Sequence, residues 1–168
     1  LKNLALSYLA ELDDAAAHTL AQTQCDGAEN MTDRVAALSA LANGNASGRD
    51  AALQRFYDDF ASEPLVIDKW FSLQAMARTT DVAAVRALMT HAAFSLKNPN
   101  RARSLIFSFC NGNPAQFHAA DGSGYAFWAE QVIALDALNP QVAARLARGL
   151  DRWRKYGPAL QEKMRAAL

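Results

Sequence analysis

The sequence predicts an all-α fold, and three observations carry this prediction. Alanine, the strongest helix former, supplies 36 of the 168 residues. Glycine and proline, which interrupt helices, supply only 8 and 5. No segment shows the sustained alternation of apolar and polar residues that marks a half-buried strand. We therefore expect a superhelical array of about ten to twelve short antiparallel helices, an α-solenoid of the HEAT or armadillo type.

The first half of the chain alternates apolar helical faces with polar breaks. Leu4, Leu6, Leu9 and Leu12 predict an amphipathic first helix, and an alanine-rich run predicts a second helix that ends near Gly27. These two helices are expected to pack as a hairpin. Four more are expected: from Asn30 to about Asn43, from Arg49 to a stop at Pro64, from about Val66 to Met76, and from about Asp81 to Met89.

A repeated dipeptide predicts the helix starts of the second half, at Asn98-Pro99, Asn113-Pro114 and Asn139-Pro140. Asparagine caps a helix N-terminus, and proline fits the first helical position because that position needs no amide donor. The helix after Pro99 is expected to bury Ala102, Leu105, Ile106 and Phe109, a long helix is expected from Tyr125 to Ala137, and Pro158 opens the last helix.

Length and charge narrow the function classes. A chain of 168 residues predicts one domain over 1–168. The zero net charge argues against nucleic-acid binding, and no apolar run is long enough to cross a membrane. Residues 82–120 contain no acid and four bases: Arg86, Lys97, Arg101 and Arg103. This segment is either a positive face for an anionic ligand such as a carboxylate or ordinary solvated helix surface.

The sequence contains no catalytic constellation. His18, His91 and His118 lack a second ligand at helical spacing, so no metal site is expected. Cys25 and Cys110 are expected to be small core residues. An apolar surrounding should raise the pKa of the Cys110 thiol, which argues against a nucleophilic pair with His118. The acidic pairs Asp13-Asp14 and Asp58-Asp59 are expected to be solvated, and Asp121–Tyr125 a structural turn.

Polar residues on the predicted helix starts are the remaining candidates. Arg101 and Arg103 fall about 200° apart on one helix, so at most one of them can point into a given cavity. Gln141 and Arg145, four residues apart, share one face of another helix. Residue chemistry alone leaves an anion-facing surface and simple solvation equally open.

Ordered motifs along nearly the whole chain give a specific resemblance. They are Asn30-Met31-Thr32-Asp33, Asp68-Lys69-Trp70-Phe71, Asn98-Pro99-Asn100-Arg101 with Arg103, Phe117-His118-Ala119, Asp121-Gly122-Ser123-Gly124-Tyr125, Asn139-Pro140-Gln141-Val142-Ala143 with Arg145, and Gln161-Glu162-Lys163-Met164-Arg165. In this combination the chain resembles the C-terminal helical domain of the bacterial aminopeptidase N family, which are zinc metallopeptidases that remove N-terminal amino acids from peptides.

The resemblance implies that this chain is a domain of a larger enzyme and holds no catalytic residues itself. The family's His-Glu-x-x-His zinc motif is absent from this chain. The zinc and the catalytic residues are therefore expected in a catalytic domain upstream, on the same polypeptide, and the isolated domain is expected to be inactive. The resemblance further implies that the domain caps the catalytic domain, encloses the cavity for peptide substrates, and lies in the cytoplasm.

Three substrate-binding residues follow from the same motifs. Arg103, Gln141 and Arg145 match family positions that face the cavity, where they are expected to bind the peptide backbone or its C-terminal carboxylate. The alternative from another class is a stand-alone α-solenoid that binds a partner protein in its groove.

Overall fold

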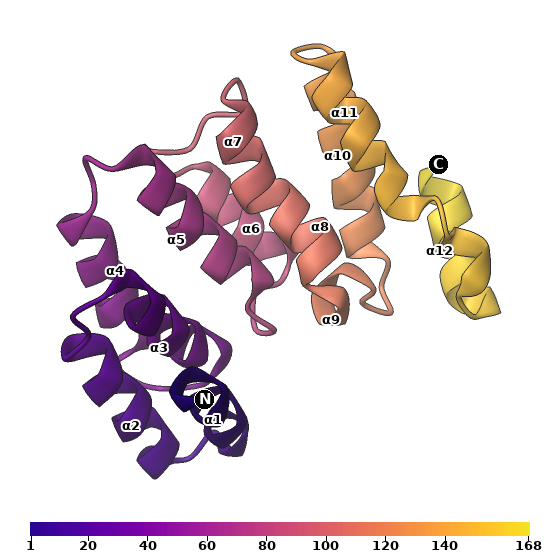
Figure 1. The fold of residues 1–168 in the computed structure, drawn as a ribbon. Coiled ribbons are helices and arrows are strands. Elements are labelled where there is room, and N and C mark those ends of the chain that lie inside the picture. Colours follow the sequence, from indigo (N-terminus) through magenta and orange to yellow (C-terminus); the bar gives the residue numbers. More distant parts are fainter. The chain divides into compact units, whose positions relative to one another are not determined.

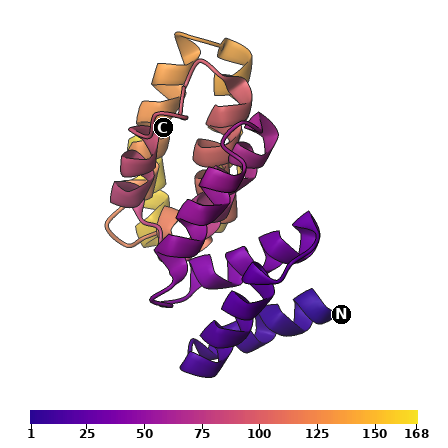
Figure 2. The same cartoon turned by 90° about the vertical axis from the view of Figure 1, so that its left-hand side faces the viewer.

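The computed structural model describes all 168 residues and contains helices only. Figures 1 and 2 show coiled ribbons joined by short loops, with no strand in either view. The twelve α-helices confirm the all-α prediction and its expected number of elements. Contacts divide the chain into two compact units, Leu1–Thr79 and Thr80–Leu168. The assignment of 1–168 to one domain stays a prediction.

The first unit is built from five helices and one 3-10 turn. These elements are α1 (Lys2–Leu9), η1 (Ala10–Leu12), α2 (Ala15–Asp26), α3 (Met31–Asn43), α4 (Arg49–Asp59) and α5 (Pro64–Met76). The α2–α3 pair packs extensively, and α1 packs on α3 as well as on α2. Asn30 caps α3 by accepting a hydrogen bond from the Asp33 amide at 2.9 Å.

Helix α1 differs from its prediction. Of its expected apolar face only Leu6 is buried, whereas Leu4, Leu9 and Leu12 are 58%, 44% and 65% exposed. The helix also ends at Leu9, and η1 and the left-handed residue Asp13 follow. The leucine spacing was thus a correct helix signal, but it did not identify the face that meets the core, since only Leu6 is buried.

Pro64 follows the end of α4 and is itself the first residue of α5. Helix α4 ends at Asp59, and Pro64 takes the first position of α5, where its missing amide proton costs no hydrogen bond. The helix predicted from about Val66 therefore starts two residues earlier. Its Trp70 indole donates to the Leu53 carbonyl at 2.8 Å and fixes α5 against α4.

The second unit contains the remaining elements: α6 (Val82–Met89), α7 (Pro99–Ala102), η2 (Arg103–Phe107), α8 (Ser108–Gly112), α9 (Pro114–Phe117), α10 (Ser123–Asp136), α11 (Pro140–Ala147), η3 (Arg148–Leu150), η4 (Trp153–Lys155) and α12 (Pro158–Ala167). All three Asn-Pro starts are confirmed. The side chains of Asn98, Asn113 and Asn139 each accept a backbone N–H of the helix that follows. Pro158 opens α12 as predicted.

The helix after Pro99 is not a regular α-helix throughout. Residues Arg103–Phe107 form a π-helical segment, η2, between α7 and α8. The predicted apolar stripe of this helix is nonetheless buried, including Leu105 and Phe109. A π-helical turn is wider than an α-helical turn, and such segments often occur at functional sites. This segment begins at Arg103.

The glycine-containing loop before α10 is a structural turn, as predicted. Gly122 adopts a φ of 78°, a conformation that favours glycine, and Asp121 accepts a hydrogen bond from the Ser123 amide at 2.9 Å. Gly124 lies so close to the Phe117 backbone that an added Cβ would stand 2.2 Å from the Phe117 carbonyl oxygen. Close packing of α9 on α10 therefore requires glycine at 124.

Edge-to-face contacts between aromatic rings fill the core of the second unit. Phe109 meets Phe127 and Phe117 edge-on at ring-centroid distances of 5.6 and 6.3 Å, and Phe117 meets Tyr125 at 5.4 Å. Cys110 is buried beside Phe109, and Cys25 is buried in the first unit, so both are core residues as expected. None of the helices combines the length and the apolar character needed to span a bilayer.

Candidate functional site

Arg103 lies at the first residue of the π-helical segment. Its side chain is half-buried, and its Nη1 donates to the Asn100 Oδ1 at 3.2 Å. Asn100 belongs to α7, which the Asn98 side chain caps through the amides of Asn100 and Arg101. The guanidinium of Arg103 is therefore held by the same helix start that carries it.

The positive face predicted for residues 82–120 is only partly present. Arg101 is 7% exposed, so it belongs to the interior rather than to a surface. Arg86 forms an ion pair with Glu130 and lies 5.4 Å from the ring centre of Phe127. Burial and pairing thus remove two of the four bases, and Lys97 and Arg103 remain. The sequence prediction counted only the charges of residues 82–120. It therefore left out Glu130, which α10 brings close to Arg86 in the fold.

Gln141 and Arg145 lie on the outer face of α11. Both side chains are exposed and make no hydrogen bond or ion pair within the chain, whereas Val142, Ala143 and Leu146 turn inward and are buried. The predicted shared face of Gln141 and Arg145 is confirmed. Arg145 thereby presents an unpaired guanidinium, whose planar set of donors suits a carboxylate or peptide carbonyls.

Three contacts hold α11 in place. It packs along α10 as an antiparallel pair, side by side in Figure 1. The Asn139 side chain accepts the Val142 amide at 3.2 Å, which caps the helix. At the other end the indole of Trp128 donates to the Leu146 carbonyl at 2.8 Å, and the indole is buried. Gln141 and Arg145 therefore project from a rigid helix.

A cavity of about 280 Å³ joins the starts of α7 and α11. Its lining residues are Leu96, Lys97, Pro99, Leu135, Leu138, Asn139 and Val142. The structure thus brings together the two helix starts that carry the predicted site residues, although Arg103, Gln141 and Arg145 do not line the cavity themselves. We call it the Asn-Pro cavity.

Sequence reasoning placed Lys97 in the positive segment but not at this cavity, and it did not single out Leu138. Each directly precedes one of the two Asn-Pro dipeptides, and both line the Asn-Pro cavity. The repeated dipeptide was the signal that marks both positions, since Lys97 and Leu138 each stand directly before an Asn-Pro helix start. The sequence carried no information on which two of the three starts would meet.

A second polar cluster joins His118 to two tyrosines. His118 Nδ1 lies 2.8 Å from the Tyr125 hydroxyl, and His118 Nε2 lies 3.2 Å from the Tyr156 hydroxyl. Burial lowers the pKa of His118 and raises the pKa of Tyr125. Burial also raises the pKa of Cys110 far above its ordinary range. With both His118 nitrogens engaged and the thiol protonated, a Cys110–His118 nucleophile is not formed.

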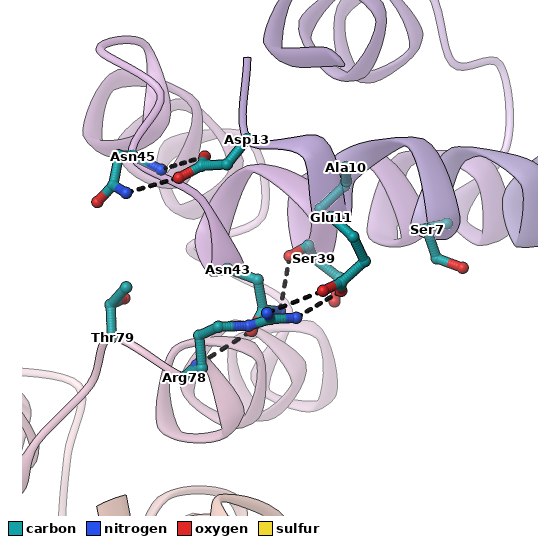
Figure 3. A pocket seen from close by; sticks show the side chains of 11 residues that line it. Ser7, Ala10, Glu11, Asp13, Ser39, Asn43, Asn45, Arg78 and Thr79 are labelled. Atoms are coloured by element: carbon teal, nitrogen blue, oxygen red, sulfur yellow. Dashed lines mark hydrogen bonds and ion pairs between the residues drawn. The ribbon is translucent and has the colours of Figure 1, made fainter. Parts of the chain in front are cut away.

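The first unit holds a polar cavity of about 240 Å³. Figure 3 shows the Arg78 guanidinium beside the Glu11 carboxylate, and Asp13 facing Asn45. The Arg78 hydrogen bonds and charge hold the pKa of Glu11 below its ordinary value. The Asn45 amide, followed by the side chains of His18 and Asn45, lowers the pKa of Asp13. The charges of this cavity are satisfied within the chain, which indicates a structural network.

The acidic pairs are exposed, as predicted, but most of these carboxylates also have partners that the prediction did not include. Asp13 bonds the Asn45 backbone at 2.9 Å, and Asp14 caps α2 by accepting the Ala17 amide at 2.8 Å. Asp59 forms an ion pair with Arg34, while Asp58 stays on the surface. Three of the four carboxylates thus hold elements together. The sequence did not reveal these partners, because contacts between distant segments are invisible in a local pattern.

The chain offers no metal centre. No group of three or more His, Cys, Asp or Glu side chains lies close enough together to hold an ion. The zinc implied by the resemblance therefore does not fit any set of residues in this chain.

Known proteins match the chain over its whole length. The family model described as "Domain of unknown function (DUF3458_C) ARM repeats" matches residues 1–168. Aminopeptidase N of Escherichia coli is 47% identical over 169 residues, which is 100% of this chain and 19% of that protein. Aminopeptidase N of Haemophilus influenzae is 41% identical with the same coverage of each chain.

A solved structure of an aminopeptidase is also similar to the chain over nearly its whole length. The crystal structure of Legionella pneumophila aminopeptidase A in complex with aspartic acid has a TM-score of 0.92 and 35% identity, covering 99% of this chain and 20% of that one. The chain thus spans about a fifth of the length of these relatives. ARM repeats are stacked helical units, so the α-solenoid prediction is confirmed. The chain belongs to the DUF3458_C family of ARM-repeat domains and is homologous to the C-terminal domain of aminopeptidase N.

Proposed function

We propose that this chain is the helical C-terminal domain of a zinc-dependent aminopeptidase that removes N-terminal amino acids from peptides. The observation that carries the proposal is the similarity to aminopeptidase N over the full length of the chain. In this proposal the domain caps the catalytic domain of the same polypeptide and encloses the substrate cavity. The zinc is held by that catalytic domain, and the isolated 168-residue chain is inactive. The location is cytoplasmic, as the resemblance implies.

Substrate positioning is the role proposed for Arg103, Gln141 and Arg145. The unpaired, exposed side chains of Gln141 and Arg145 support it, because a rigid helix presents them without a competing partner. The half-buried guanidinium of Arg103, with one donor used on Asn100, retains further donors for a ligand. These groups would bind the peptide backbone or its C-terminal carboxylate. Holding the peptide in register lowers the entropic part of the barrier to hydrolysis at the zinc.

The native polypeptide provides the test. It is isolated from its source cells with an antibody against this domain, and its intact mass, zinc content and hydrolysis of alanine p-nitroanilide are measured. The proposal expects a zinc-bearing chain several times heavier than 18.2 kDa that releases p-nitroaniline. A metal-free chain near 18.2 kDa without hydrolysis would contradict the proposal and favour the stand-alone scaffold.

A further inference from the structure

The Asn-Pro cavity has the lining of a ligand site for one short side chain. Five of its lining residues are apolar: Leu96, Pro99, Leu135, Leu138 and Val142. At about 280 Å³ it is slightly smaller than the range of about 300–1,000 Å³ for small-molecule sites. It therefore suits a single aliphatic or aromatic side chain better than a multi-ring cofactor.

The polar groups of the cavity are donors. Lys97 is its only charged lining residue, is exposed, and makes no hydrogen bond or ion pair within the chain. The Asn139 Oδ1 is used on the Val142 amide, while its Nδ2 group has no partner in the chain. No carboxylate lines the cavity. A ligand that complements this lining is apolar at one end and carries a negative charge beside it.

We propose that the Asn-Pro cavity binds the C-terminal residue of a peptide, with its aliphatic side chain against Leu138 and Val142 and its carboxylate on the Lys97 ammonium. This inference rests on the proposed function for its substrate class, since a peptide end combines a side chain and a carboxylate in this way. The cavity also lies at a helix start that carries one of the proposed peptide-binding residues. Val142 lines the cavity, and Gln141, the preceding residue, faces outward on the same helix start.

Lys97 and the three proposed positioning residues then bind different parts of the peptide. Lys97 takes the terminal carboxylate, which leaves Arg103, Gln141 and Arg145 for the carbonyls of the peptide backbone. The cavity then selects peptides by their last residue: leucine or a residue of similar shape is favoured, and aspartate is disfavoured because its second carboxylate would enter an apolar lining. A C-terminal amide lacks the charge that Lys97 binds.

Calorimetric titration of the full-length protein tests this subsite without requiring hydrolysis. The probes are N-acetyl-Ala-Ala-Leu, its C-terminal amide, and N-acetyl-Ala-Ala-Asp. The unmodified protein should bind the leucine peptide with the free carboxylate about three- to fivefold more tightly than the amide, as expected for a half-exposed ion pair. It should bind the aspartate peptide more weakly still.

Two variants separate the contributions, each with a matched control. Lys97→Gln should abolish the difference between carboxylate and amide, and Leu138→Ala should reduce the preference for leucine over aspartate by about threefold or more. Both residues are exposed, so the fold should persist. Lys69→Gln and Leu65→Ala change an exposed lysine and an exposed leucine of α5 and should preserve both differences.

Equal weakening of the acid and the amide by Lys97→Gln would overturn the inference. Equal binding of the three probes by the unmodified protein would also overturn it. Hydrolysis of alanine p-nitroanilide is measured on the same samples. A protein that binds as expected but does not hydrolyse refutes the proposed function and leaves the subsite standing, while hydrolysis without discrimination among the probes refutes the subsite alone.

Discussion

The Trp128 indole donates a hydrogen bond to the backbone carbonyl of Leu146, with 2.8 Å between nitrogen and oxygen. Trp128 belongs to α10 and Leu146 to α11, so this bond fixes the last turn of the helix that presents Gln141 and Arg145. The bond is buried, and a carbonyl left without its donor there cannot be solvated freely. The position of the two exposed side chains thus depends on an aromatic residue on the neighbouring helix.

Trp128→Phe should lower the free energy of unfolding of the 168-residue chain by about 1–3 kcal/mol, because it leaves the Leu146 carbonyl unsatisfied and removes buried ring area. Urea denaturation followed by circular dichroism measures the change. The matched control is Trp153→Phe, since Trp153 is half-exposed and its indole makes no hydrogen bond in the chain. Equal stability of the two variants would contradict the role assigned to the Trp128 bond.

Gly124→Ala should destabilise the chain by about 1–3 kcal/mol or more, since its Cβ would meet the Phe117 carbonyl oxygen at 2.2 Å and force α9 away from α10. Gly157→Ala is the control, because no atom lies within 4 Å of a Cβ built there. Thermal denaturation of both variants compares them. A melting temperature of Gly124→Ala equal to that of the control would show that α9 shifts at no cost.

Acid should destabilise the first unit through Asp13. Its pKa is lowered in the fold, mainly by the Asn45 amide, so its contribution to stability is present above the ordinary value of 3.8 and is lost as pH falls through the lower folded value. Asp13→Asn should therefore flatten the dependence of unfolding free energy on pH below about pH 4. Asp50→Asn, which changes an exposed acid without a partner, should leave the slope unchanged. Equal slopes for both variants would refute this coupling.

Metal removal should abolish hydrolysis by the full-length protein without changing the stability of the 168-residue chain. Under the proposed function, 1,10-phenanthroline abolishes hydrolysis by the full-length protein, and added zinc restores it. The melting temperature of the 168-residue chain should not change with the chelator, since no group of side chains in it can hold a metal ion. A chelator-dependent shift in the melting of the short chain would contradict the absence of a metal centre.

Local signals predicted the helices well, because capping chemistry acts within one turn. Each Asn-Pro pair both satisfies the free amides of a helix start and supplies the fixed φ of its first residue, so Asn98, Asn113 and Asn139 were identified from sequence alone. The turn at Gly122 and the burial of Cys110 followed from similarly local chemistry.

Pairings between distant segments could not be predicted in this way. Leu4 is exposed although its spacing marks an apolar face, Arg101 is buried although it is charged, and Asp13 is a structural anchor although it stands in an acidic pair. In each case the outcome depends on packing or contacts with other segments of the chain. The Asn-Pro cavity was missed for the same reason, since Lys97 and Leu138 are about 40 residues apart and meet only in the fold.

Steady-state kinetics of Arg145→Gln in the full-length protein tests the central claim most directly. The substrates are a tripeptide and alanine p-nitroanilide, which has no backbone beyond its first residue. We expect KM for the tripeptide to rise about five- to tenfold and KM for the anilide to change less than about twofold, because under the proposed function only the tripeptide reaches Arg145. Arg103→Gln should behave likewise, and Arg165→Gln, an exposed arginine on α12, should change neither. Equal changes on both substrates would contradict a role in positioning the peptide.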